Sequence, residues 1–127
     1  MDDLKDLAET LLGAYALTGK LLGLLPIPIN LPPLEAEGGL NGARALERAR
    51  KSIHDLPLDP VLVALLDDMI FEWLVGRDLC TLAVSVSPDP HRIYGLRRAL
   101  ARFGHLSEGA ERLLLPPGQT LSPDQDQ

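Results

Sequence analysis

Three carboxylates interrupt the most apolar run of the sequence, VLVALLDDMIFEWLVGRDLC at residues 61–80. Asp67 and Asp68 are adjacent, and Glu72 follows Asp68 by four residues. Residues four apart share one face of a helix, so Asp68 and Glu72 can hold a cation between them with Asp67 beside them. Carboxylate oxygens are the ligands that magnesium takes, which makes a small all-α metal-dependent hydrolase one interpretation of this run.

The run also resembles two families with acidic helical motifs. It is similar to the magnesium-binding runs of terpene synthases, a resemblance that implies a far longer chain than these 127 residues. It is similar as well to the acid motifs of MazG-like nucleotide pyrophosphatases, which implies a partner acid pair on a neighbouring helix. The candidates for that partner are Glu9, Glu35, Glu37 and Glu47.

A second interpretation follows from the helical periodicity of residues 60–76. Eight apolar side chains fall on one half of the helix, and the three carboxylates share the other half with Ala64, Phe71 and Val75. The acids therefore leave the core face intact, and we expect arginines to pair with them. The predicted charged pairing set is Asp67, Asp68, Glu72, Arg92, Arg98 and Arg102, with Arg97 as a further candidate. On this interpretation the chain binds no metal and no other cofactor.

Other residue types with catalytic potential do not form a recognisable site. His54, His91 and His105 lack the spacing of metal ligands, and Cys80 is the single cysteine, so it forms no zinc motif or disulfide framework. The sequence contains no nucleophile elbow and no glycine-rich phosphate loop. We therefore expect a protein that is not an enzyme.

Residues 97–115, RRALARFGHLSEGAERLLL, resemble a helix-turn-helix, with Gly104 at the turn and Ser107 opening the second helix. This makes a DNA-binding transcriptional regulator an alternative function. The second helix would present Glu108, Glu111 and Arg112, and two acids facing phosphates disfavour DNA binding. The competing interpretation is an αα-hairpin that closes the core.

The elements that must position these residues are helical. Leucine supplies 28 of the 127 residues while aromatic residues are 4%, a composition that favours helices over sheets. We predict an all-α compact bundle of about five helices in one domain, residues 1–115, followed by a disordered tail at 116–127. The expected helices cover residues 2–25, 40–56, 60–76, 90–103 and 107–115, and a Pro/Gly-rich crossover at 26–39 follows the first.

Local signals mark several helix ends. Asn41 is the expected N-cap of the second helix, and Asp59-Pro60 and Asp89-Pro90 each combine an N-cap with a proline at the first helical position. Gly104 is the expected stop of the fourth helix. Residues 77–86 can continue the third helix or form a strand, and we favour the helix because a lone strand has nothing to pair with.

These observations favour a non-catalytic protein–protein interaction module, a small acidic adaptor, chaperone or regulator that forms a homodimer and binds another protein. The predicted interface residues are Leu4, Leu11, Tyr15, Phe71, Trp73 and Val75. The net charge of −6 disfavours nucleic acid, and five charges in the longest apolar run disfavour a membrane span. The start Met1-Asp2-Asp3 lacks a signal peptide's positive charge, and arginine outnumbers lysine nine to three, so we expect a cytoplasmic bacterial protein.

Overall fold

The computed structural model describes residues 2–34 and 39–119 of the chain. Across these residues it has four α-helices and no strand. The helices are α1 (Asp2–Gly23), α2 (Leu40–Ile53), α3 (Pro60–Ser85) and α4 (Pro90–Leu114). The all-α prediction is confirmed, whereas the helix count in the described part of the chain is four and not five.

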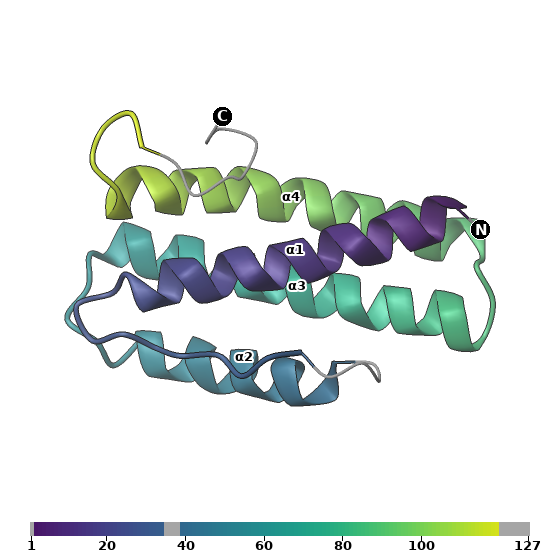
Figure 1. Ribbon diagram of the computed structural model, residues 1–127, viewed down its shortest axis with the longest axis horizontal. Coiled ribbons are helices and arrows are strands. Elements are labelled where there is room, and N and C mark those ends of the chain that lie inside the picture. Colours follow the sequence, from purple (N-terminus) through teal and green to yellow (C-terminus); the bar gives the residue numbers. More distant parts are fainter. Residues whose placement is uncertain (1, 35–38, 120–127) are drawn as a thin grey trace.

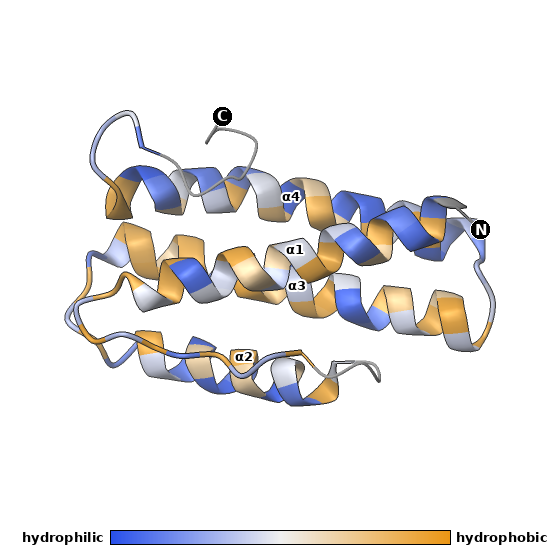
Figure 2. Ribbon diagram, in the orientation of Figure 1, coloured by the Kyte–Doolittle hydropathy of each residue, from blue (hydrophilic) through white to orange (hydrophobic). Residues whose placement is uncertain are grey.

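Helix α3 is the centre of the arrangement, because it contacts each of the other three helices (Figure 1). Short connections at 54–59 and 86–89 make α2 and α4 both antiparallel to α3, as expected for helical hairpins. The most extensive contact in the bundle is between α3 and α4, and α1 packs across both of these helices. Helices α2 and α4 carry hydrophilic residues on their outer sides (Figure 2).

The proline-preceded starts of α3 and α4 lie where the sequence predicts them. The Asp59 carboxylate accepts a hydrogen bond from the backbone N–H of Val61 at 2.7 Å and so caps α3, with Pro60 as the first helical residue. Asp89 occupies the equivalent position before Pro90 of α4, but its carboxylate accepts from the Ser87 hydroxyl at 2.8 Å. Helix α3 continues past Gly76 to Ser85, which confirms the helical alternative for residues 77–86.

Helix α2 begins at Leu40, as the predicted range does, but the predicted N-cap Asn41 was wrong. The capping residue is Gly39, which has a φ of 65°, and no side chain caps this helix. The left-handed conformation costs glycine nothing but is unfavourable for residues with a Cβ atom. Helix α2 also ends at Ile53, three residues before the predicted end, and residues 54–56 form a turn.

The predicted end of a helix at Gly104 was also wrong, and with it the fifth helix. Helix α4 runs without interruption to Leu114. The Ser107 hydroxyl, expected to open a new helix, is buried and donates instead to the Gly104 carbonyl oxygen within α4 at 2.9 Å. Because burial of Phe103 and Ala110 on one stripe stabilises a continuous helix, the packing outweighs the weak helix propensity of glycine. A helix-turn-helix is therefore absent from residues 97–114.

The core is built around Trp73, of which 1% is exposed. Its indole N–H donates to the Leu11 carbonyl oxygen at 2.9 Å, and its ring lies 5.4 Å from that of Tyr15. Buried apolar side chains from all four helices surround this pair. The tryptophan thus fixes α1 against α3 both by apolar contact and by a hydrogen bond.

The expected crossover at 26–39 is described over residues 26–34 and at Gly39, and residues 35–38 lie outside the described part. Its described portion is not helical and runs alongside α1 and α2 (Figure 1). The Tyr15 hydroxyl donates to the Pro32 carbonyl oxygen at 2.6 Å, and Leu31 and Leu34 pack against the core. Of the expected tail, residues 116–119 are described as non-helical, and the remainder lies outside.

Candidate interaction surface

The three carboxylates of α3 point in different directions. Asp67 faces α2, where it accepts a hydrogen bond from Nε of Arg50 at 2.7 Å. His54 places its Nε2 atom 3.7 Å from the other Asp67 oxygen. This ion pair is partly buried, and the hydrogen bond from Asp67 raises the pKa of the Arg50 guanidinium above its ordinary value. Asp67 therefore holds α2 against α3.

Glu72 faces the opposite side of α3. Its carboxylate accepts a hydrogen bond from Nε of Arg102 on α4 at 2.8 Å, and 13% of the Glu72 side chain is exposed. Asp68 lies between these two directions, is exposed, and has no ion-pair partner among the described residues. The carboxylates therefore do not converge on one point. Nowhere in residues 2–34 and 39–119 do three histidine, cysteine, aspartate or glutamate side chains group as metal ligands do.

The predicted arginine partners divide into three cases. Arg102 pairs with Glu72, as the charged pairing set requires. Arg92 instead secures the start of α4, where its guanidinium lies 3.5 Å from Asp89 and donates to the Ser87 carbonyl oxygen. Arg98 lies on the same face of α4 as Arg102, one turn earlier, and is exposed.

The pairing of Asp67 with Arg50 was missed, and of the two helix-to-helix ion pairs of α3 only Glu72 with Arg102 has a signal in the sequence. Residues equally distant from the middle of an antiparallel helical hairpin lie at the same level along it. Glu72 and Arg102 are equally distant from Ser87, whereas Arg50 lies four residues before the 54–59 connection and Asp67 lies eight residues after it. Once the hairpin of α3 and α4 is recognised, this symmetry identifies the Glu72–Arg102 pair, whereas the Arg50–Asp67 pair emerges only from the structure.

The predicted interface residues also fall into two groups, one buried in the core and one partly or largely exposed. Leu11, Tyr15 and Trp73 lie in the core of the single chain. Leu4 and Val75 are half-buried, and Phe71 is 48% exposed. The first three are thus buried by α1 and α3 packing together, and an interface in the folded chain must use the others.

Phe71 belongs to a longitudinal strip of α3 that the other helices leave uncovered, here called the open face of α3. The strip repeats at intervals of three and four residues, which places its members on one side of the helix. It comprises Val61, Ala64, Asp68, Phe71, Val75, Asp78, Leu82 and Val86. All are exposed except the half-buried Val75, and exposure reaches 60% at Val61 and 65% at Val86.

Basic side chains border the open face on both sides. On the α2 side, the Arg50 guanidinium lies 5.5 Å from the centre of the Phe71 ring, a cation–π contact. On the α4 side stand Arg98 and Arg102, and Arg102 is bound to Glu72. Arginines therefore line both edges of the strip, and the ring of Phe71 lies near its middle.

Two exposed acids, Asp68 and Asp78, interrupt the apolar strip. The Asp78 carboxylate accepts a hydrogen bond from the adjacent Arg77 at 3.2 Å, and 71% of the Asp78 side chain is exposed. Exposed contacts of this kind contribute little stability and leave the carboxylate open to further partners. The open face is thus an apolar strip with two acids between two basic edges.

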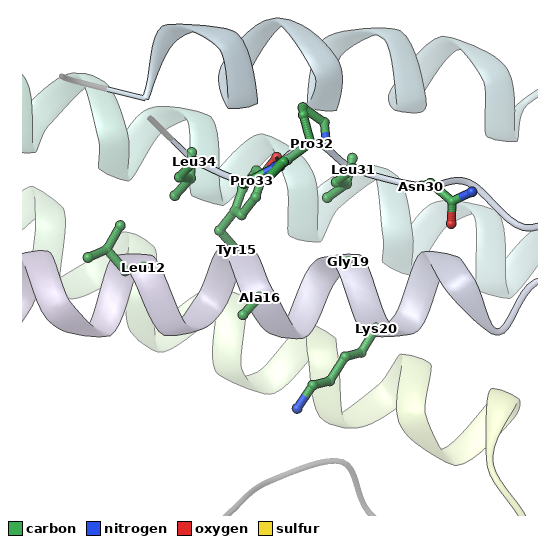
Figure 3. A pocket seen from close by; sticks show the side chains of 10 residues that line it. All are labelled: Leu12, Tyr15, Ala16, Gly19, Lys20, Asn30, Leu31, Pro32, Pro33 and Leu34. Atoms are coloured by element: carbon green, nitrogen blue, oxygen red, sulfur yellow. Dashed lines mark hydrogen bonds between the residues drawn. The ribbon is translucent and has the colours of Figure 1, made fainter. Parts of the chain in front are cut away.

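Concave grooves lie elsewhere along α1, and two of them are lined in part by the core residues Tyr15 and Trp73. The larger, of about 590 Å³, lies between α1 and the crossover, and the Lys20 side chain points away from the crossover (Figure 3). The other, of about 390 Å³, lies between α1 and α3 and is lined largely by apolar side chains, including Trp73 and Cys80. Burial raises the pKa of the Cys80 thiol, so the thiol stays protonated near neutral pH.

Comparisons with known proteins give no relative for this chain: no family model, no curated protein and no solved structure matches it. None of the helices in the described ranges combines the length and the apolar character that crossing a membrane requires.

Proposed function

We propose that this chain is a non-catalytic protein–protein interaction module, a small acidic adaptor, chaperone or regulator, and that the open face of α3 is its binding surface. One observation carries the proposal: α3 has apolar residues on every side, yet its three neighbouring helices cover only part of it. A helix of that composition is normally buried on all sides.

The chemistry of the open face supports binding to a protein. Phe71 presents an aromatic ring near the middle of the strip, and aromatic anchors surrounded by polar groups are typical of protein interfaces. The bordering arginines can pair with carboxylates of a partner without being buried. The carboxylates of α3, by contrast, stabilise the fold through Arg50 and Arg102, and this supports a structural role for Asp67 and Glu72.

The test is site-specific photocrosslinking in the host cell. Phe71 is replaced by the photoreactive amino acid benzoylphenylalanine, and Leu12, an apolar residue of α1 with 55% exposure, is replaced in a control. Irradiation is expected to give discrete protein adducts from position 71, which mass spectrometry identifies, and far fewer from position 12. Equal adduct yields at the two positions would remove the basis for a binding surface on α3.

A further inference from the structure

The residues of the open face follow a palindromic order. Read from Val61, the strip is apolar, apolar, acidic, apolar, and from Val75 it continues apolar, acidic, apolar, apolar. The centre of this palindrome lies between Phe71 and Val75, which is also the middle of α3 (Pro60–Ser85). A pattern that reads the same in both directions is self-complementary under a two-fold rotation that reverses the helix.

We infer that the partner of the open face is a second copy of this chain, with the two α3 helices packed antiparallel about a two-fold axis between Phe71 and Val75. The inference rests on the proposed function and names the occupant of that surface. Under this rotation Phe71 meets Val75 of the other copy, Ala64 meets Leu82, and Val61 approaches Val86. Each apolar position thus faces an apolar position.

The charges give the same register independently. Asp68 precedes Glu72 by one turn and so lies toward α4, because Glu72 pairs with Arg102. Arg98 of α4 is level with Gly76, at which a Cβ atom would lie 3.6 Å from the Cβ of Ala99. The two-fold rotation carries the level of Gly76 to that of Ile70, about 3 Å along the helix from Asp68. Arg98 of one copy therefore reaches Asp68 of the other.

The second acid of the strip is matched on the opposite edge. Asp78 follows Asp67 by eleven residues, three helical turns, so it lies on the α2 side as Asp67 does. Arg50 is level with Asp67, and the same rotation brings it level with residue 79 of the other copy, next to Asp78. The rotation also brings Asp68 level with Asp78 of the other copy, but the two acids lie on opposite edges. Both exposed acids thus meet an arginine in the register that the apolar residues select.

The size of the surface is adequate for a stable dimer. From Val61 to Val86 the strip is about 38 Å long at the helical rise per residue. With the facing edges of α2 and α4 it is about 20 Å wide, given the usual spacing of packed helices. This matches the roughly 800 Å² that each partner contributes to a standard interface.

The experiment is a charge-reversal exchange with the purified full chain, followed by light scattering and native mass spectrometry. Arg98→Glu and Asp68→Arg are each expected to weaken self-association by about 100-fold or more, because each places like charges together twice in the dimer. An equimolar mixture of the two variants is expected to form heterodimers. In the mixed dimer the new glutamate at position 98 faces the new arginine at position 68, and the other contact keeps its original Asp68 and Arg98. Arg97→Glu is the matched control, because the neighbouring Arg97 points to Asp3 of α1 and should leave the dimer intact.

Each result decides the inference. Thermal unfolding verifies that the variants, all at exposed positions, are folded. Dimerisation of either single variant at the wild-type strength, or a mixture that stays monomeric, would overturn this arrangement. If the wild-type chain is monomeric while position 71 crosslinks to a different protein in the host, the second-copy inference fails and the proposed function stands. If position 71 captures neither, both fail.

Discussion

The substitution Gly104→Ala tests the continuity of α4, which the sequence did not predict. An added Cβ atom at Gly104 meets nothing within 4 Å, and the residue lies inside Pro90–Leu114. Alanine in a helix interior is more stable than glycine by roughly 0.5–1 kcal/mol, because glycine loses more backbone freedom on folding. We therefore expect Gly104→Ala to raise the free energy of unfolding by about 0.8 kcal/mol.

The same substitution at Gly39 should have the opposite sign. Gly39 has a φ of 65°, and its Cβ atom would lie 3.2 Å from Leu34 Cδ2. The left-handed conformation alone costs an alanine about 1–2 kcal/mol. Urea unfolding monitored by circular dichroism at about 222 nm, where helices give their signal, measures the free energy of unfolding of both variants. In thermal unfolding, Gly104→Ala should raise the melting temperature by about 3 °C in a chain of this size. A destabilised Gly104→Ala would refute the reasoning, because it would mean that Gly104 ends a helix in the left-handed conformation.

Three further predictions concern the core, the α2 contact and the half-buried thiol of Cys80. In chemical denaturation, Trp73→Ala should lower the free energy of unfolding by about 4 kcal/mol, whereas Tyr94→Ala should change it by about 0.5 kcal/mol or less, because only Trp73→Ala removes a buried ring. Similar losses in the two variants would contradict the placement of Trp73 in the core. Asp67→Asn should cost about 1 kcal/mol through the weakened ion pair with α2, and Asp68→Asn should leave the stability of the isolated chain unchanged, so equal effects in the same assay would refute the assigned contacts. Cys80 should react with iodoacetamide more slowly than free cysteine at pH 8 or so, because burial raises its pKa. The folded chain holds the thiol proton more tightly than the unfolded chain. The contribution of Cys80 to stability is therefore full below the ordinary thiol pKa and falls as pH rises through the raised pKa. Alkylation at the rate of free cysteine would show that the protein does not shield the thiol.

The fold was predictable where local chemistry and periodicity agree. Asp59-Pro60 and Asp89-Pro90 are strong start signals, and each begins a helix at the predicted residue. Gly104 and Ser107 carry equally plausible local signals, but they lie within a stripe of buried residues that keeps α4 continuous. Tertiary packing decided that helix, and a pattern read one segment at a time does not include it.

The candidate surface was predictable only in part for a similar reason. The sequence places Phe71 and Val75 on the same side of α3 as the carboxylates, and Phe71 is indeed half-exposed there. It does not show which apolar residues of α1 and α3 are used within the chain, so Leu11 and Trp73 were assigned to an interface although they contact each other in the core. Distinguishing the two requires the helix arrangement, because both sets are apolar and periodic.

The most direct test of the account is the mass of the chain in solution, with and without an intact open face. Multi-angle light scattering at micromolar concentration is expected to give twice the 13.8 kDa of one chain for the wild type and for Leu12→Glu, a change at an exposed residue of α1. Phe71→Glu is expected to give the mass of one chain with unchanged helical content, because a charge replaces the central apolar contact without touching the core. A wild-type mass of one chain, or a Phe71→Glu variant that remains dimeric, would contradict the claim that the open face of α3 holds two copies together.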